Sequence, residues 1–173
     1  GGISESMIEE QLKLALTEPT VDLAEHKSER KLFKRKKYGA CIKKLTAKAE
    51  ESASAKTALD QLNKYAQAHF KIVDALKEDA EYLSGINFLA KIEATFKGSE
   101  HAKTAKTMKS SWKSDKSIKN EITAELILDS AKALMAKGKA KKAKKTLQSI
   151  VHSKKYRDTK AASAAKVLLN RME

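Results

Sequence analysis

The side chains that most often carry out chemistry in proteins are few in this sequence. It contains one cysteine, Cys41, and four histidines, His26, His69, His101 and His152. None of the histidines belongs to a motif such as HExxH, the pattern by which one helix holds a catalytic zinc ion. A single cysteine also excludes an internal disulfide bond and any zinc site built from several cysteines. We therefore expect neither a metal site nor a cofactor.

The acidic residues and glycines do not indicate catalysis either. Carboxylate pairs such as Glu9 with Glu10, and Glu50 with Glu51, lie on strongly polar helix faces, where nothing would raise their pKa values. Gly138 and Lys139 are not followed by Ser or Thr and lack the upstream glycine of a phosphate-binding loop. The sequence predicts that the protein is not an enzyme.

Three residues have two interpretations each. Cys41 falls at a helix-packing position, which favours a buried small residue over a nucleophile. His69 lies beside an apolar stripe and is better interpreted as an edge-of-core residue than as a ligand. Trp112 stands among lysines and serines, so it either packs on a core or forms an exposed anchor for a partner; we favour packing.

The formal net charge of +14 is concentrated in two segments. Residues 27–48 carry +9 and residues 130–172 carry +12, which leaves −7 for the remainder of the chain. The cations that form the candidate surface for an anionic partner are Lys34, Arg35, Lys36, Lys37, Lys139, Lys141, Lys142, Lys144 and Lys145.

Two interpretations of these cations remain open. Ala143, Leu147 and Ile150 share one helix face, so the lysines between them project into water, and a solvated exterior is the simpler reading. The alternative is a surface for nucleic acid or another polyanion, such as an acidic protein, a polysaccharide or a lipid surface. The chain has 32 lysines to four arginines, and no aromatic residues interleave with the basic runs, which disfavours recognition of bases.

The composition predicts an all-α fold, since one proline, six glycines and 5% aromatic residues are too few for a β-sandwich or barrel. We expect an N-terminal helix and linker over residues 1–24, with the helix beginning at Ser4 or Ser6. Residues 25–173 are expected to form a helical domain with a flexible connector at 109–119. No uncharged stretch approaches the ~20 residues of a membrane-spanning helix, and residues 1–5 do not resemble the start of a signal peptide.

The expected helices of that domain follow from apolar spacing and from breaks at glycine. They cover about 23–36, 40–50, a run of some 30 residues after Ser52, a helix through Leu89 and Phe96, then about 102–112, 118–135, 140–151 and 159–172. The predicted core residues are Leu89, Ile92, Phe96, Leu134, Leu147, Ile150 and Leu168.

Two stretches of the sequence match each other, as expected for a repeat protein. Gly85, Leu89, Ile92, Phe96, Ser99, Ala102 and Ala105 correspond to Ala143, Leu147, Ile150, Tyr156, Thr159, Ala162 and Ala165, with two additional residues in the later turn. The small residue permits close approach of two helices, and the hydroxyl residue caps the helix that follows. A weaker third copy begins at Cys41 with Leu45.

These helical pairs resemble tetratricopeptide-type repeats, with irregular spacing and incomplete landmark residues. The elements Lys37, Tyr38 and Gly39, and the closing pattern from Tyr156 onward, are similar to the helical C-terminal regions of uncharacterised planctomycete and verrucomicrobial proteins. Some of those proteins carry a thioredoxin-like domain upstream, although no CxxC motif occurs here. The resemblance implies stacked antiparallel helical hairpins and favours an exported or periplasmic location.

We therefore expect a non-catalytic protein-interaction or scaffold module that binds a protein or peptide partner, because stacked hairpins leave an extended groove. The alternatives are a basic protein that binds nucleic acid or another anionic polymer, and an accessory domain of an exported thioredoxin-like protein. The sequence does not specify the oligomeric state.

Overall fold

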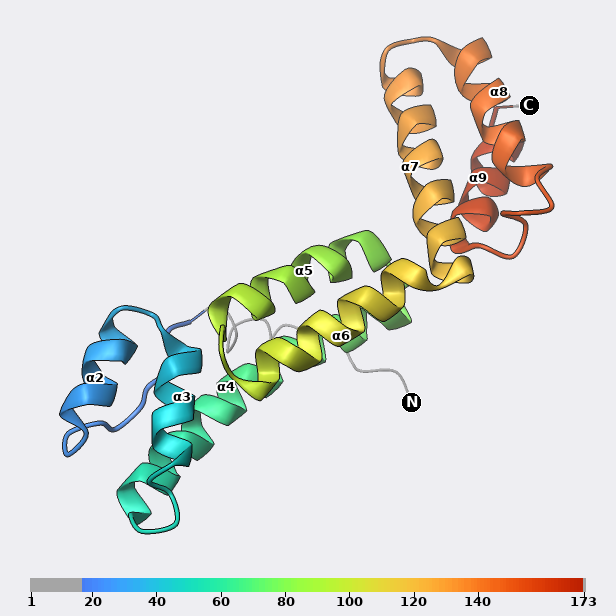
Figure 1. Cartoon of the computed structure of the whole chain (residues 1–173). Coiled ribbons are helices and arrows are strands. Elements are labelled where there is room, and N and C mark those ends of the chain that lie inside the picture. The colour runs from blue at the N-terminus through green and yellow to red at the C-terminus, as the bar shows by residue number, and fades with distance from the viewer. Residues whose placement is uncertain (1–16, 173) are drawn as a thin grey trace. The chain divides into compact units, whose positions relative to one another are not determined.

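The computed structural model describes residues 17–172, and in that range the chain forms eight α-helices and no strand (Figure 1). The predicted all-α class is confirmed. The helices are α2 (Lys27–Lys34), α3 (Tyr38–Thr46), α4 (Ala53–Glu78), α5 (Tyr82–Thr95), α6 (Glu100–Ser114), α7 (Lys116–Ala136), α8 (Ala140–Val151) and α9 (Lys160–Asn170). The helix expected from Ser4 or Ser6 lies outside the described residues.

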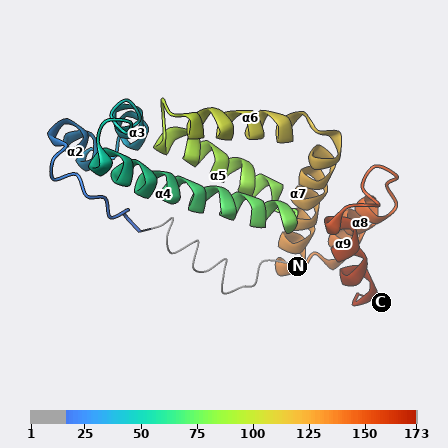
Figure 2. The ribbon, with the colours of Figure 1, turned by 90° about the horizontal axis from the view of Figure 1, so that it is seen from below.

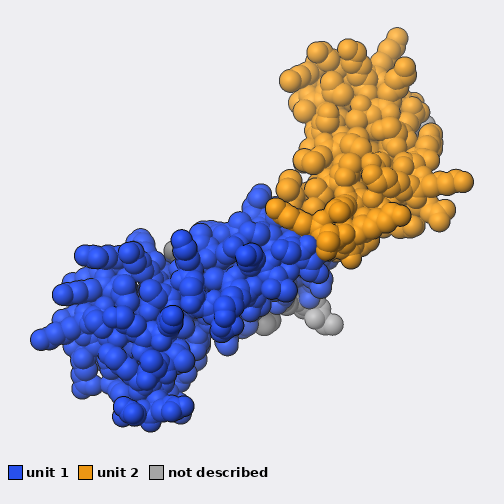
Figure 3. Space-filling view, in the orientation of Figure 1, with its two compact units in different colours: residues 1–79, 84–111 blue, residues 80–83, 112–173 orange. Residues whose placement is uncertain are grey.

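The chain separates into two compact units, coloured differently in Figure 3. Of the described residues, 17–79 and 84–111 form unit 1, and 80–83 and 112–172 form unit 2. This division differs from the single domain expected over residues 25–173. Because helices of similar amphipathic pattern occur in both units, sequence periodicity alone does not reveal the boundary.

In unit 1, α2 packs on α3 and α3 packs on α4. Helix α5 lies beside α4 (Figures 1 and 2), and the start of α6 contacts α4. The predicted core residues Leu89, Ile92 and Phe96 are fully buried here. Aromatic contacts join the elements: the ring of Phe96 lies 5.9 Å from Tyr65 and 6.3 Å from Tyr38, between centroids. Cys41 is also fully buried, as predicted.

In unit 2, α7, α8 and α9 pack against one another in pairs. Leu147 and Ile150 of α8 are fully buried at the centre of this bundle, which confirms their predicted place in the core. Leu168 packs against the same cluster but is only half-buried, and Leu134 is half-buried as well. The predicted core residues of α8 are therefore fully buried, whereas those near the ends of α7 and α9 are only half-buried.

Residues 109–119, expected to be a flexible connector, are helical on both sides of Asp115. Asp115 has an extended backbone, and its side chain accepts hydrogen bonds from the backbone N–H groups of Ser117 and Ile118 at 2.7 and 3.0 Å. This is an N-cap, so α7 begins directly after α6 ends. The many polar residues of this stretch are the exposed faces of two helices and not those of a loop.

Two glycines end elements where the sequence predicted breaks. Gly98 after α5 and Gly138 after α7 have φ values of +88° and +68°, a region that other residues enter only at a cost. Among residues 17–172 no helix is long and apolar enough to cross a membrane.

A buried carboxylate fastens α9 to α7. Glu121, with 9% of its surface exposed, accepts hydrogen bonds from the backbone N–H groups of Lys160 and Ala161, each at 3.0 Å. The hydroxyl of Thr159 accepts from the N–H of Ala162 at 3.0 Å. The first three N–H groups of α9 are thus satisfied by side chains, and the negative charge also complements the positive end of the helix dipole.

We predict that Glu121→Ala destabilises unit 2 by about 2 kcal/mol, because it removes the acceptor of two buried N–H groups. Amide hydrogen exchange at Lys160 and Ala161 should become faster. Urea unfolding should show the corresponding loss of stability. Asp129→Ala is the control on the same helix: Asp129 is exposed and pairs with Lys132 at the surface, so this substitution should cost under about 0.5 kcal/mol. Equal effects of the two substitutions would contradict the role given to Glu121.

Candidate functional site

A groove of about 720 Å³ lies in unit 1 where three elements meet. Its lining residues come from α3, from α4, from the turn before α6 and from the first residues of α6: Ile42, Lys43, Thr46, Leu59, Asn63, Gln67, Gly98, Ser99, Glu100, His101 and Lys103. Apolar side chains, uncharged amides and two lysines are therefore within reach of one bound segment. Such a mixture is usual in binding grooves, where a few polar groups fix the orientation of a ligand.

Close packing at Gly39 sets the wall that α3 contributes. A Cβ atom at this position would lie 2.2 Å from the carbonyl oxygens of both Phe96 and Lys97. The helix can therefore approach the end of α5 only because the residue has no side chain. Ile42 and Thr46 of α3 line one groove together with the turn before α6 and the first residues of α6.

A contact between His101 and Asn63 joins the start of α6 to α4 at the groove. The Nε2 atom of His101 lies 2.8 Å from Oδ1 of Asn63, and a carbonyl oxygen only accepts, so Nε2 carries the proton. The ring of His101 also contacts Phe96, with centroids 5.8 Å apart. Burial lowers the pKa of His101, so the imidazole is neutral at pH 7.

A second buried histidine lies deeper in the same unit. His69 was predicted at the edge of the core, and only 2% of its surface is exposed. Its Nδ1 atom lies 2.9 Å from the carbonyl oxygen of Tyr65, and its ring lies edge-on to Phe96. Burial lowers the pKa of His69 below the ordinary 6.5, despite the opposing effect of the hydrogen bond to Tyr65.

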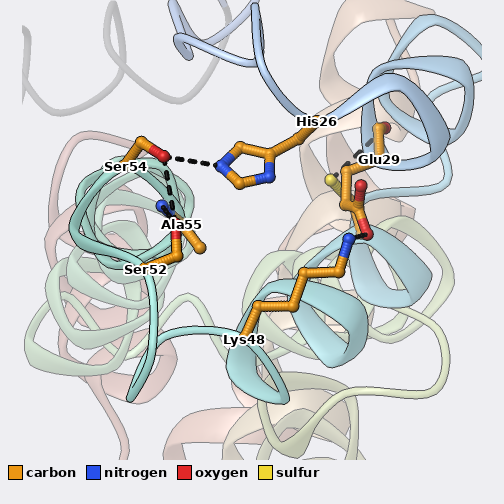
Figure 4. Close-up of polar contacts among 7 residues, drawn as sticks. His26, Glu29, Lys48, Ser52, Ser54 and Ala55 are labelled. Atoms are coloured by element: carbon orange, nitrogen blue, oxygen red, sulfur yellow. Dashed lines mark hydrogen bonds and ion pairs between the residues drawn. The ribbon is translucent and has the colours of Figure 1, made fainter.

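A buried ion pair fastens α2 to the end of α3 (Figure 4). The carboxylate of Glu29 is fully buried, and its Oε1 lies 2.9 Å from Nζ of Lys48, which is half exposed. Burial raises the pKa of Glu29, but the interactions of its carboxylate with Lys48 and Ser28 outweigh burial and lower the pKa to about 2. Glu29 is the one acid among residues 27–48, and this isolation is the signal in the sequence that could have pointed to a buried carboxylate.

The same region contains a serine in contact with a histidine. Nε2 of His26 lies 3.1 Å from Oγ of Ser54, near the start of α4 (Figure 4). The Ser54 hydroxyl donates to Oε2 of Glu25 at 2.7 Å, whereas a nucleophilic serine must give its proton to the histidine. This contact therefore fastens the segment before α2 to α4.

The cations singled out in the sequence are divided between the two units. Lys34, Arg35, Lys36 and Lys37 are exposed at the turn between α2 and α3, and Lys36 pairs with Glu18 at 2.7 Å. Lys139, Lys141, Lys142 and Lys145 are exposed at and along α8, while Lys144 is half-buried. None of these nine lines the groove of unit 1, to which the basic segment contributes Lys43.

Trp112 is buried, with 5% of its surface exposed, and its ring meets Tyr82 edge-on at 5.4 Å between centroids. The alternative that it forms an exposed anchor is wrong, and the favoured packing role is confirmed. It lies on the last turn of α6, where polar neighbours occupy the exposed positions of the helix.

Within the part of the chain that the structure describes, no three His, Cys, Asp or Glu side chains gather in a way that could hold a metal ion. Comparison of the chain with protein families, with curated proteins and with solved structures found no match.

We predict that Lys48→Met destabilises unit 1 by about 2 kcal/mol at pH 7, since the buried Glu29 carboxylate loses its partner. This loss of stability is smaller than the loss expected on breaking a fully buried pair, because Lys48 is half exposed. The lowered pKa of Glu29 stabilises the fold above pH 4.5, and this contribution disappears as pH falls towards 2. The difference between variant and parent, measured by urea unfolding, should therefore shrink below pH 4.5. The control Lys44→Met, at an exposed position on α3 four residues before Lys48, should stay within about 0.5 kcal/mol of the parent both at pH 7 and below pH 4.5.

We also predict a loss of stability on mild acidification. The pKa values of His69 and His101 are lowered in the folded chain, so below pH 6.5 the unfolded chain binds more protons. Stability should fall by up to about 1 kcal/mol per pH unit for each histidine between pH 6.5 and the folded pKa. The double variant His69→Gln and His101→Gln should flatten the pH dependence of thermal unfolding. His152→Gln, an exposed control, should keep the slope of the parent, and an unchanged slope in the double variant would exclude this assignment.

Proposed function

We propose that the protein is a non-catalytic interaction module, built of helical repeats, that binds an extended segment of a partner protein. The observation that carries the proposal is the groove of about 720 Å³ between α3, α4 and the start of α6. Its lining of apolar, amide and lysine side chains, drawn from three elements, suits a few residues of an extended peptide.

Contacts at matched positions support the repeat. The hydroxyl of Ser99 donates to the carbonyl oxygen of Phe96 at 2.7 Å, and the hydroxyl of Thr159 donates to that of Tyr156 at 2.6 Å. The matched core residues Leu89, Leu147, Ile92 and Ile150 are all fully buried, as are Cys41 and Leu45 of the weaker copy. The two clear copies thus share their buried core residues. They also share a turn, which joins α5 to α6 in one copy and α8 to α9 in the other.

A further pair of residues extends the match to α4 and α7. Asn63 and Glu121 are 58 residues apart, the same separation as Leu89 and Leu147. Asn63 contacts His101, the second residue of α6, and Glu121 accepts from the N–H of Ala161, the second residue of α9. The helices α4, α5 and α6 therefore correspond to α7, α8 and α9, which favours a tetratricopeptide-like arrangement of hairpins.

The lining of the groove suits the backbone and side chains of a peptide. Ile42 and Leu59 offer apolar contact, while the amides of Asn63 and Gln67 both donate and accept hydrogen bonds. Lys43 and Lys103 are exposed at its edge, although Lys103 pairs with Glu100 at 2.6 Å. The partner segment is therefore expected to combine a buried apolar residue with acidic side chains at its edge.

The test is selection of peptides from a random-sequence display library on the full chain, followed by fluorescence anisotropy with the selected peptides. Leu59→Gln should weaken binding about tenfold, the equivalent of one lost apolar contact of roughly 1.5 kcal/mol. Leu126→Gln makes the same change at a leucine in unit 2 that is 53% exposed, and it should leave the affinity unchanged.

Failure of the library to yield any binder, or equal losses in the two leucine variants, would refute the groove as the binding site. Both variants should first show the parent's helical circular dichroism, so that a loss of affinity is not a loss of fold.

A further inference from the structure

One face of α8 is lined with lysines. Ala143, Leu147 and Ile150 are fully buried on the packing side of the helix, whereas Lys139, Lys141, Lys142 and Lys145 are exposed. Lys139 and Lys142, Lys142 and Lys145, and Lys141 and Lys145 are three or four residues apart, so the side chains of each pair neighbour one another on the helix surface. We call these four residues the lysine face.

The surroundings of the lysine face do not neutralise it. Residues 130–157 contain ten Lys or Arg and no Asp or Glu. Within residues 17–172 none of the four ammonium groups has a carboxylate within 4.0 Å, whereas Lys132 pairs with Asp129 and Arg157 pairs with Asp158. The lysine face is therefore an uncompensated positive surface of unit 2.

The same residues oppose the formation of their own helix. Lys139 occupies the N-cap without a capping side-chain hydrogen bond, and the first turn of α8 contains no acid. Positive charges there face the positive end of the helix dipole, and like charges at three- or four-residue spacing repel each other. Burial of the opposite face offsets this repulsion, so neither the fold of α8 nor its capping explains the lysines.

A chain of phosphates is the partner that this surface fits best. A helix of 12 residues is about 18 Å long, and double-stranded nucleic acid carries one negative charge per ~1.7 Å of its axis. Lysine acts as a point charge on phosphate without reading bases. The face has no aromatic residue on which unpaired bases would stack and no large apolar residue that would enter a membrane.

We propose that the lysine face of α8 binds the phosphate backbone of double-stranded nucleic acid without sequence preference. This surface belongs to unit 2 and the peptide groove to unit 1, so each proposal stands or fails by itself.

The experiment measures binding of the full chain to a fluorescent duplex of about 20 base pairs, as DNA and as RNA, by anisotropy between ~50 and ~200 mM salt. Four phosphate contacts predict a slope of about −3.6 for log K against log salt concentration. Replacing all four residues of the lysine face with glutamine should weaken binding at least tenfold at ~50 mM salt and bring the slope close to zero. The same variant should unfold at an equal or higher temperature, because repulsion along α8 is relieved, so failure to fold does not obscure the result.

The matched control removes four charges from unit 1 through Lys34→Gln, Arg35→Gln, Lys37→Gln and Lys44→Gln, all at exposed positions. It has the same net charge as the first variant and should keep the parent's affinity within about threefold. Equal losses in both variants would show attraction to net charge alone and overturn the proposal. It is also overturned if neither duplex binds at ~50 mM salt, or if polyglutamate or vesicles of anionic lipid bind more tightly than the duplexes.

Discussion

The packing of Phe96 determines how the elements of unit 1 meet. Its side chain is fully buried, and four other rings lie with their centroids 5.5–6.3 Å from its own: Tyr38, Tyr65, His69 and His101. These rings belong to α3, α4 and α6, the same three elements that line the groove. The backbone of Phe96 adds a second constraint, because its carbonyl oxygen occupies the space that a side chain at Gly39 would need. The positions of α3, α4 and α6 around the groove are therefore set by the packing of the Phe96 ring and by the absence of a side chain at Gly39.

Two acids that lie close to the cationic segments are used inside the fold. Glu29 is the one acid of its basic segment, and it is buried against Lys48 between α2 and α3. Glu121 in unit 2 is committed to the first turn of α9. These two carboxylates hold helices together, while others such as Asp129 and Asp158 pair with cations at the surface. The charge on the surface of this protein thus depends on where its acids are placed as well as on how many cations it has.

Apolar spacing and glycine breaks were enough to predict the all-α fold, most helices and buried residues such as Leu147. They could not predict contacts between distant residues, for example Tyr38 with Phe96 or Asn63 with His101, because each needs the tertiary packing first. The sequence predicted that stacked hairpins leave a groove, but it did not predict which elements line the groove in unit 1. Trp112 was read correctly as a packing residue although its polar neighbours predicted a loop; those neighbours are the solvent face of α6. Local polarity alone does not distinguish an exposed helix face from a connector.

Cys41 makes the opening of unit 1 accessible to direct chemical measurement. Its thiol is fully buried, its Sγ donates to the carbonyl oxygen of Glu29 at 3.6 Å, and burial raises its pKa to about 11. Only the thiolate reacts readily with alkylating or disulfide reagents, so the folded chain is protected both by exclusion of the reagent and by protonation. Labelling then proceeds through states in which α3 has left its neighbours. The single sulfur atom is therefore a natural reporter of the free energy of that local unfolding, separate from the unfolding of the whole chain.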